Sequence, residues 1–182
     1  MDAPGWALGD YLNRPLRELF DDVASGDSVP AAGSAVAALG ALAAGLTAKV
    51  ARRSSSRLPN AAELAQRADE LRAGLEPLVT ADAAGYADAM AAPEGRAAAM
   101  AAVSAGTASI AESAAEIAQL AAHLALDGNQ NLRWDATAAV RIAAVAAEVA
   151  AELTAANVGE DDPFPRACSA AILARTAADR FK

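Results

Sequence analysis

The chain has 182 residues, 54% of them apolar but only 4% aromatic, so it can bury a core but must build that core largely from alanine. Fifteen basic residues against 23 acidic ones give a net charge of −8, which argues against nucleic-acid binding because nucleic acid requires a basic face. Cys168 is the only cysteine, so an intrachain disulfide is excluded and a reducing, cytoplasmic location is expected.

No window of the sequence alternates with a period of two residues, so we predict an all-α fold. Residues 1–182 are expected to form a single domain, a multihelical array of about six long and short helices. No basic segment begins the chain, so no signal peptide is predicted. The predicted helices cover residues 12–25, 34–53, 60–91, 94–127, 132–157 and 165–181.

A break precedes the second predicted helix. Pro30 and Gly33 interrupt the chain, and Ser34 is a residue type preferred as an N-cap. Small residues around a helix N-terminus leave its backbone N–H groups accessible, which favours an anionic or carbonyl-bearing ligand. A plain loop followed by a capped helix explains the same residues equally well.

The second predicted helix has one face of large apolar residues and another of alanine and glycine. This pattern suits a crowded helical core or a subunit interface. The uncharged run 31–48 is long enough for a membrane span, but its small residues favour a buried helix, so no membrane partner is expected. The large residues are Val36, Leu39, Leu42, Leu46 and Val50, and the small ones are Ala37, Gly40, Ala41, Ala44, Gly45 and Ala48.

The third predicted helix carries an apolar seam, and Gly74 and Pro77 are expected to bend it. Continuing the helical spacing brings Asp82 and then Tyr86 onto the seam. A carboxylate at an inward position needs a partner or a ligand, because an unpaired buried charge is costly. Asp82 is therefore either a functional residue or a partly exposed aspartate bonded to a neighbouring helix.

The inward face of the fifth predicted helix has a polar residue at each end, Asp135 and Asn157. They are 22 residues apart, about 33 Å along a helix, so they cannot serve the same ligand atom within one subunit. Either they belong to different sites, or a dimer brings copies from two chains together. With the small-residue face of helix 34–53, this spacing predicts a homodimer.

The loop before this helix is rich in side-chain amides. Gly128 is expected to end the fourth helix and Asn131 to cap the fifth. A heteroaromatic ring could use all the loop's polar groups, whereas a structural turn would use one or two. The loop and the residues that follow it are Asn129, Gln130, Asn131, Leu132, Arg133 and Trp134.

Four stretches of the chain occur in the order and approximate spacing of known motifs. They are Pro30-Ala31-Ala32-Gly33-Ser34, Asp82-Ala83-Ala84-Gly85-Tyr86, Gly128-Asn129-Gln130-Asn131 with Trp134-Asp135, and Asn157. Over about residues 16–157 the chain thereby resembles the cyclodeaminase/cyclohydrolase family of folate enzymes, which comprises formiminotetrahydrofolate cyclodeaminases and methenyltetrahydrofolate cyclohydrolases. It departs from the family pattern at Ala31, Ala32, Gln130, Trp134 and Leu153.

The resemblance implies hydrolysis of 5,10-methenyltetrahydrofolate to 10-formyltetrahydrofolate by carboxylate acid/base catalysis, without a metal or any cofactor beyond the folate substrate. Asp135 is the expected acid/base, in a partly apolar pocket near Trp134 that would raise its pKa, and Asp82 assists or binds the pterin. The expected substrate-binding residues are Gly33, Ser34, Tyr86, Asn129, Asn131, Arg133 and Asn157.

Other interpretations stay open. Lys49, Arg52, Arg53 and Arg133 are candidates for binding the glutamate tail of folate, although basic residues are also common at a helix C-terminus. The chain is alternatively a formiminotetrahydrofolate cyclodeaminase that releases ammonia, a non-catalytic folate-binding or assembly protein, or an enzyme for another amidine or formyl substrate. His123, the only histidine, is predicted to be an ordinary helix residue.

Overall fold

A computed structural model describes residues 10–91, 93–158 and 162–181, and within these ranges every regular element is a helix. The all-α prediction is therefore confirmed for the described residues. The α-helices are α1 (Leu16–Val23), α2 (Ala32–Arg52), α3 (Ala61–Leu75), α4 (Leu78–Ala91), α5 (Arg96–Asp127), α6 (Arg133–Val158) and α7 (Phe164–Asp179), with short 3₁₀ helices η1 (Tyr11–Asn13), η2 (Pro93–Gly95) and η3 (Gln130–Leu132).

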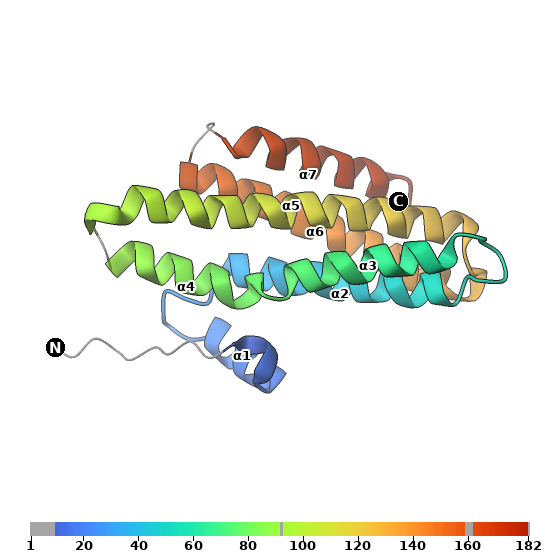
Figure 1. Ribbon diagram of the computed structural model, residues 1–182, viewed down its shortest axis with the longest axis horizontal. Coiled ribbons are helices and arrows are strands. Elements are labelled where there is room, and N and C mark those ends of the chain that lie inside the picture. The colour runs from blue at the N-terminus through green and yellow to red at the C-terminus, as the bar shows by residue number, and fades with distance from the viewer. Residues whose placement is uncertain (1–9, 92, 159–161, 182) are drawn as a thin grey trace.

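The long helices α5 and α6 pack against each other along most of their length and form the middle of the molecule (Figure 1). Helix α7 covers one side of this pair, and α2, α3 and α4 cover the other. Helix α6 runs antiparallel to α2, since it begins beside the C-terminal end of α2 and returns toward its N-terminal end (Figure 1).

Alanine makes this close packing possible. The facing sides of α5 and α6 bury many alanines completely, so the two helices meet with little more than Cβ atoms between them. Only a few large residues fill the remaining space. Among the described residues, the largest fully buried side chains are Leu75, Ile110, Ile117 and Leu124.

The small-residue face of α2 lies in the helical core, one of the two settings that its pattern suggested. The small-residue face, including Ala37, Gly40 and Ala44, is buried inside the chain, while Leu39 and Leu42 point outward. A small-residue face lets α2 approach the other helices closely, which large side chains would prevent. Ala37, Gly40 and Ala44 are therefore not available for a subunit contact.

The uncharged run in α2 belongs to a packed helix, as predicted. Within the described ranges, α2 is the one helix whose length and mean hydropathy of 1.6 would suffice to cross a membrane, and 56% of that apolar stretch is buried in the protein. Such burial is typical of the core helix of a globular protein.

The predicted helix 12–25 is divided into η1 and α1. Two further predicted helix boundaries were also wrong. The segment 60–91 is not one bent helix: α3 ends at Leu75 and α4 begins at Leu78, because Pro77 has no N–H to continue the hydrogen-bond ladder. The second correction concerns the start of α2, which begins at Ala32 after an extended Ala31. Ser34 is thus the third residue of the helix rather than its N-cap.

Candidate active site

Helix α4 places the carboxyl group of Asp82 against the first turn of α2. A Cβ atom built on Gly33 would lie only 2.2 Å from Asp82 Oδ1 and 2.3 Å from Oδ2, so only glycine leaves room for the carboxyl group. The backbone N–H of Ser34 donates a hydrogen bond to Asp82. Asp82 thus points inward as predicted, and it is partly exposed and bonded to a neighbouring helix, as the structural alternative expected. Its carboxyl group occupies the end of α2 that lacks a local side-chain cap.

Burial changes the acidity of Asp82. It raises the pKa of this half-buried carboxyl group, and the hydrogen bond from the Ser34 N–H opposes that rise with a smaller effect. The group therefore holds a proton to a higher pH than an exposed aspartate does. Such a carboxyl group, at a helix N-terminus, is suited to exchanging protons with a ligand.

The Ser34 side chain adds an unused polar atom to this end of α2. Its residue is fully buried, and its Oγ has no hydrogen-bond partner among the described residues. A buried hydroxyl group without a partner costs free energy, typically about 1–3 kcal/mol. A bound water or ligand atom would remove that cost.

Asp135 lies at the opposite end of α2. Its carboxylate forms a 2.6 Å ion pair with Lys49 Nζ, and both side chains are partly open to solvent. Gly33 and Lys49 are 16 residues apart on one helix, which corresponds to about 24 Å. One chain therefore does not bring the two predicted catalytic carboxylates, Asp82 and Asp135, into one site.

The amide-rich loop is largely occupied by structural hydrogen bonds. Asn129 donates from Nδ2 to the Arg53 carbonyl at 2.9 Å, and its Oδ1 accepts the Asn131 N–H at 3.1 Å. The buried Ser54 hydroxyl also accepts the Asn129 N–H. Asn129 therefore caps η3 and ties it to α2, whereas Asn131, predicted as the cap, is exposed. The physical reason is that the chain makes a 3₁₀ turn before α6 begins.

The partly apolar pocket predicted around Asp135 and Trp134 is not formed by the described residues. Trp134 is 77% exposed and does not enclose the neighbouring carboxylate. Arg133 is also exposed, at the first residue of α6. Trp134 lies on the outer side of the helix because alanines of α6 occupy the inner side. This end of α2 is a polar surface rather than an apolar pocket.

Tyr86 and Asn157 lie toward the Asp82 end of the molecule. Tyr86 is half-buried, one turn after Asp82 on α4. Asn157 lies three residues after Thr154 on α6. Thr154 Oγ1 is 2.7 Å from Thr107 Oγ1, which is in the first half of α5. Of the predicted set, Gly33, Ser34 and Asp82 are in contact at this end of α2, whereas Asn129 and Asn131 are hydrogen-bonded to each other near its other end.

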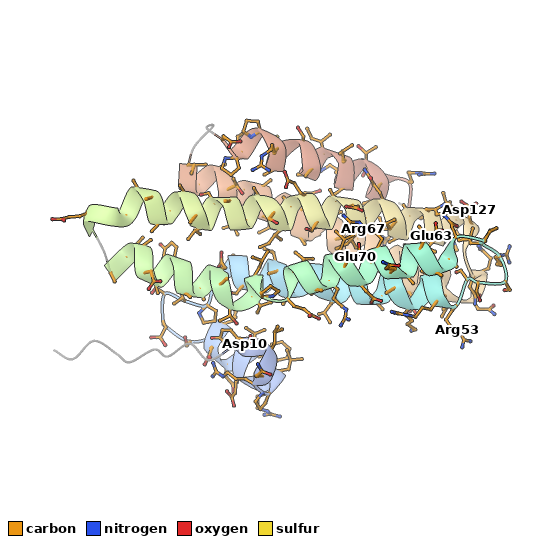
Figure 2. All side chains as sticks on the ribbon, in the orientation of Figure 1. Asp10, Arg53, Glu63, Arg67, Glu70 and Asp127 are labelled. Carbon is orange, nitrogen blue, oxygen red and sulfur yellow. The ribbon has the colours of Figure 1, made fainter. Side chains whose placement is uncertain are left out.

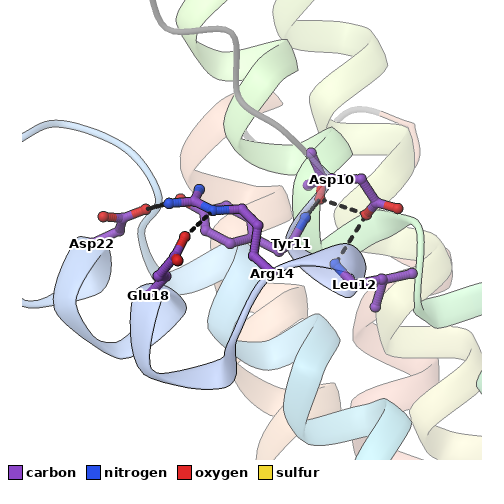
Figure 3. A network of polar contacts seen from close by, with 7 residues as sticks. Asp10, Tyr11, Leu12, Arg14, Glu18 and Asp22 are labelled. Atoms are coloured by element: carbon purple, nitrogen blue, oxygen red, sulfur yellow. Dashed lines mark hydrogen bonds and ion pairs between the residues drawn. The ribbon is translucent and has the colours of Figure 1, made fainter.

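Sequence reasoning missed the anchor that holds the N-terminal segment beside this site. The Tyr11 N–H donates to Thr80 Oγ1 at 2.9 Å, two residues before Asp82, and the Tyr11 hydroxyl donates to Asp22. Arg14 completes the network with Glu18 and Asp22 (Figure 3). No local sequence pattern indicates a contact between residues 69 positions apart.

Other candidate chemistry is limited in the described ranges. His123 pairs with Asp127 one turn later, at 3.0 Å, which confirms its prediction as an ordinary helix residue. Within the described residues, no three His, Cys, Asp or Glu side chains cluster closely enough to hold a metal ion.

Comparisons with known proteins agree with the helical arrangement. A crystal structure of formiminotetrahydrofolate cyclodeaminase from Thermotoga maritima superposes with a TM-score of 0.85 and 19% sequence identity, covering 93% of this chain and 94% of that one. Comparison with curated proteins gave no significant match. The sequence matches the formiminotransferase-cyclodeaminase family over residues 15–162, a span that includes Gly33, Asp82 and Asp135. The chain therefore belongs to the formiminotransferase-cyclodeaminase family.

Proposed function

We propose that this chain acts on the one-carbon group carried between N5 and N10 of tetrahydrofolate, as a formiminotetrahydrofolate cyclodeaminase. Family membership and the activity named for the Thermotoga maritima protein support the substrate class. The observation that carries the proposal is the Asp82 carboxyl group, which is half-buried, raised in pKa and held against the N-terminus of α2. This moves the acid/base role from Asp135 to Asp82.

The reaction needs one proton to move between two nitrogens. Folate N10 attacks the carbon of the protonated N5-formimino group, and Asp82 takes the N10 proton as the new C–N bond forms. Asp82 then gives that proton to the amino nitrogen as its bond to carbon breaks. The products are ammonia and the 5,10-methenyl cation, so atoms and charge balance. Acid/base catalysis of this kind typically accelerates a reaction about 10²–10⁴-fold.

Hydrolysis of the 5,10-methenyl group, the first expectation from the sequence, uses the same carbon. Asp82 would then take a proton from the attacking water, and the buried Ser34 hydroxyl, which lacks a partner in the described structure, would help to position that water. The two reactions differ in the nucleophile and the leaving group, so they can be measured separately.

The test compares the wild type with Asp82→Asn. Ammonia release from 5-formiminotetrahydrofolate measures deamination, and loss of near-ultraviolet absorbance from 5,10-methenyltetrahydrofolate measures hydrolysis. We expect ammonia release by the wild type and a loss of about 10²–10⁴-fold in Asp82→Asn. Asp88→Asn is the matched control, because Asp88 lies on the same helix but is exposed.

Two results would contradict the proposal. If Asp82→Asn retains wild-type turnover, Asp82 is not the acid/base. If the wild type shows no rate above buffer with either substrate, the chain is not this enzyme, and calorimetry with 5-formyltetrahydrofolate then measures folate binding alone.

A further inference from the structure

The hydroxyl group of Thr80, in the first turn of α4, forms its hydrogen bonds outside its own helix. It accepts the Tyr11 N–H at 2.9 Å and donates to Asp10 Oδ1 at 3.3 Å. Several other helical hydroxyl groups, such as that of Thr47, donate to the carbonyl group four residues earlier on their own helix. Thr80 instead joins α4 to the N-terminal segment, residues 10–31. Figure 2 shows Asp10 on this segment, far from the polar residues labelled at the other end of the molecule.

The N-terminal segment is held to the long helices by few residues. Its Tyr11 and Leu19 belong to the same buried apolar cluster as Val36 of α2 and Val79 of α4. Helix α1 itself packs mainly against η1 and lies apart from the long helices (Figure 1). Tyr11 also stabilises the segment internally, because its hydroxyl donates to Asp22 at 2.9 Å (Figure 3). The attachment of the segment to α4 therefore depends strongly on Tyr11.

Thr80 and Asp82 lie on different sides of α4. A separation of two residues corresponds to about 200° around a helix, so Thr80 contacts the N-terminal segment while Asp82 contacts α2. The contact with α2 is close, since Gly33 has no room for a Cβ atom beside the Asp82 carboxyl group. The N-terminal segment runs from Tyr11 directly into the first turn of α2. One continuous stretch of chain thus holds α4 from two sides.

We propose that Thr80 is a positioning residue for Asp82. By accepting the Tyr11 N–H, Thr80 holds α4 against the first turn of α2 and thereby fixes the Asp82 carboxyl group on the Ser34 N–H. Position matters here because a displacement of about 1 Å near a reacting group can lower a rate about 10²-fold. The effect on turnover depends on the proposed function, whereas the effect on the position of Asp82 does not.

The charges on neighbouring elements leave the pKa of Asp82 a clear indicator of its position. Helix α2 has no charged residue from 32 to 48, and α5 has none from 97 to 111. Removing the uncharged Thr80 hydroxyl changes no charge, so a resulting change in the Asp82 pKa reports a change in its surroundings. The titratable groups on the elements packed around α4 are Asp10 and Tyr11 at η1, Glu76 at the end of α3, Tyr86 and Asp88 on α4, and Glu94 in η2.

Carbon-13 NMR titration of the Asp82 carboxyl group tests the proposal without turnover. Burial is the larger cause of the raised Asp82 pKa. Thr80→Val lacks the acceptor for the Tyr11 N–H, so it should let water reach the carboxyl group and lower its pKa toward that of an exposed aspartate. Thr80→Ser should keep the wild-type pKa. Thr176→Val is the matched control, because the Thr176 hydroxyl donates to the Ile172 carbonyl within α7. An Asp82 pKa in Thr80→Val that is unchanged or higher overturns the proposal.

Amide hydrogen exchange provides a second measurement. The Ala35 N–H donates to the Ala31 carbonyl within α2, whereas the Ser34 N–H donates to Asp82. In Thr80→Val and in the smaller Thr80→Ala, we expect the Ser34 amide to exchange about tenfold faster, as for the loss of one hydrogen bond, with Ala35 much less affected. Unchanged exchange at Ser34, or an equal increase at Ala35, overturns the proposal.

Steady-state kinetics separates this role from the proposed function. We expect Thr80→Val to lower kcat by about 10²-fold with little change in KM, because the substrate still binds while the proton-transfer group is displaced. Thr80→Ser should restore most of kcat, and Thr176→Val should match the wild type. An unchanged kcat in Thr80→Val overturns the positioning role in turnover. A wild type without activity contradicts the proposed function instead, and the Asp82 pKa and Ser34 exchange still decide whether Thr80 positions Asp82.

Discussion

The two ends of α2 each hold a carboxylate, and the two groups differ in environment. Asp82 is half-buried against Gly33, and burial raises its pKa. Asp135 lies at the partly exposed C-terminal end, where it forms an ion pair with Lys49. A surface ion pair contributes little free energy, whereas a desolvated carboxyl group can change charge during a reaction. Motif position alone does not distinguish these two roles.

The two ends of α2 also differ in how their backbone polar groups are hydrogen-bonded. At the N-terminal end, Asp82 from α4 accepts a backbone N–H of α2. At the C-terminal end, the Ser54 hydroxyl and the Arg53 carbonyl accept hydrogen bonds from Asn129 in the loop between α5 and α6, which leaves Asn129 little capacity for a ligand. In the described structure, the N-terminal end retains the Ser34 hydroxyl group without a hydrogen-bond partner, whereas the C-terminal end is held to the neighbouring loop by structural hydrogen bonds.

Of the variants considered, Gly33→Ala should have the largest effect, and it acts at the N-terminal end of α2. The new Cβ would overlap the Asp82 carboxyl group, so we expect a loss of about 1–3 kcal/mol in the free energy of unfolding, as for other overpacked sites. Displacement of Asp82 should also abolish most turnover. Urea unfolding and ammonia release measure both. Gly74→Ala, which meets no atom within 4 Å, should be neutral or stabilising, and equal effects from the two variants would argue against the close contact.

Ser54→Ala should destabilise the C-terminal end of α2 without changing turnover. It removes the acceptor for the Asn129 N–H, which should cost about 1–3 kcal/mol in unfolding free energy. Turnover per folded molecule should stay at the wild-type level. Ser55→Ala, at an exposed neighbouring residue, is the control. A stability equal to that of the control would show that the hydrogen bond contributes nothing.

The pH dependence of stability should isolate Asp82. Because its folded pKa is raised above its unfolded value, its protonated form stabilises the folded state at low pH, and this contribution is lost as pH rises through the folded pKa. Asp82→Asn should therefore gain stability relative to the wild type from about pH 4 upward, by about 1.4 kcal/mol for each unit of pKa elevation. Denaturant titrations across this range measure the difference. A difference independent of pH would contradict the raised pKa.

Asp135→Asn should have the smallest effect. Losing an exposed ion pair typically costs about 0.2–1 kcal/mol, and we expect kcat to stay near that of the wild type. Thermal unfolding and steady-state kinetics measure these quantities. A loss in kcat of about 10²-fold or more would return the acid/base role to Asp135.

Several features of this protein followed from local pattern. The absence of alternating segments predicted an all-helical chain, and the seam that continues to Asp82 predicted its inward position. The sequence also indicated that Pro77 interrupts the third predicted helix, although Pro77 separates two helices rather than bending one. These features depend on residues within a few turns of one another, where helical spacing determines which side chains share a face.

Tertiary structure decided the rest. The sequence of α2 contains both a leucine face and an alanine face, and only packing against the other helices determined that the alanines are buried and Leu42 is exposed. Likewise, the sequence identified Asp82, Asp135 and Asn129 as polar groups at helix ends, but it did not determine which would be desolvated, ion-paired or used as a cap. The physical reason is that pKa and hydrogen bonding depend on neighbours from distant segments, whereas helical periodicity depends only on the chain itself.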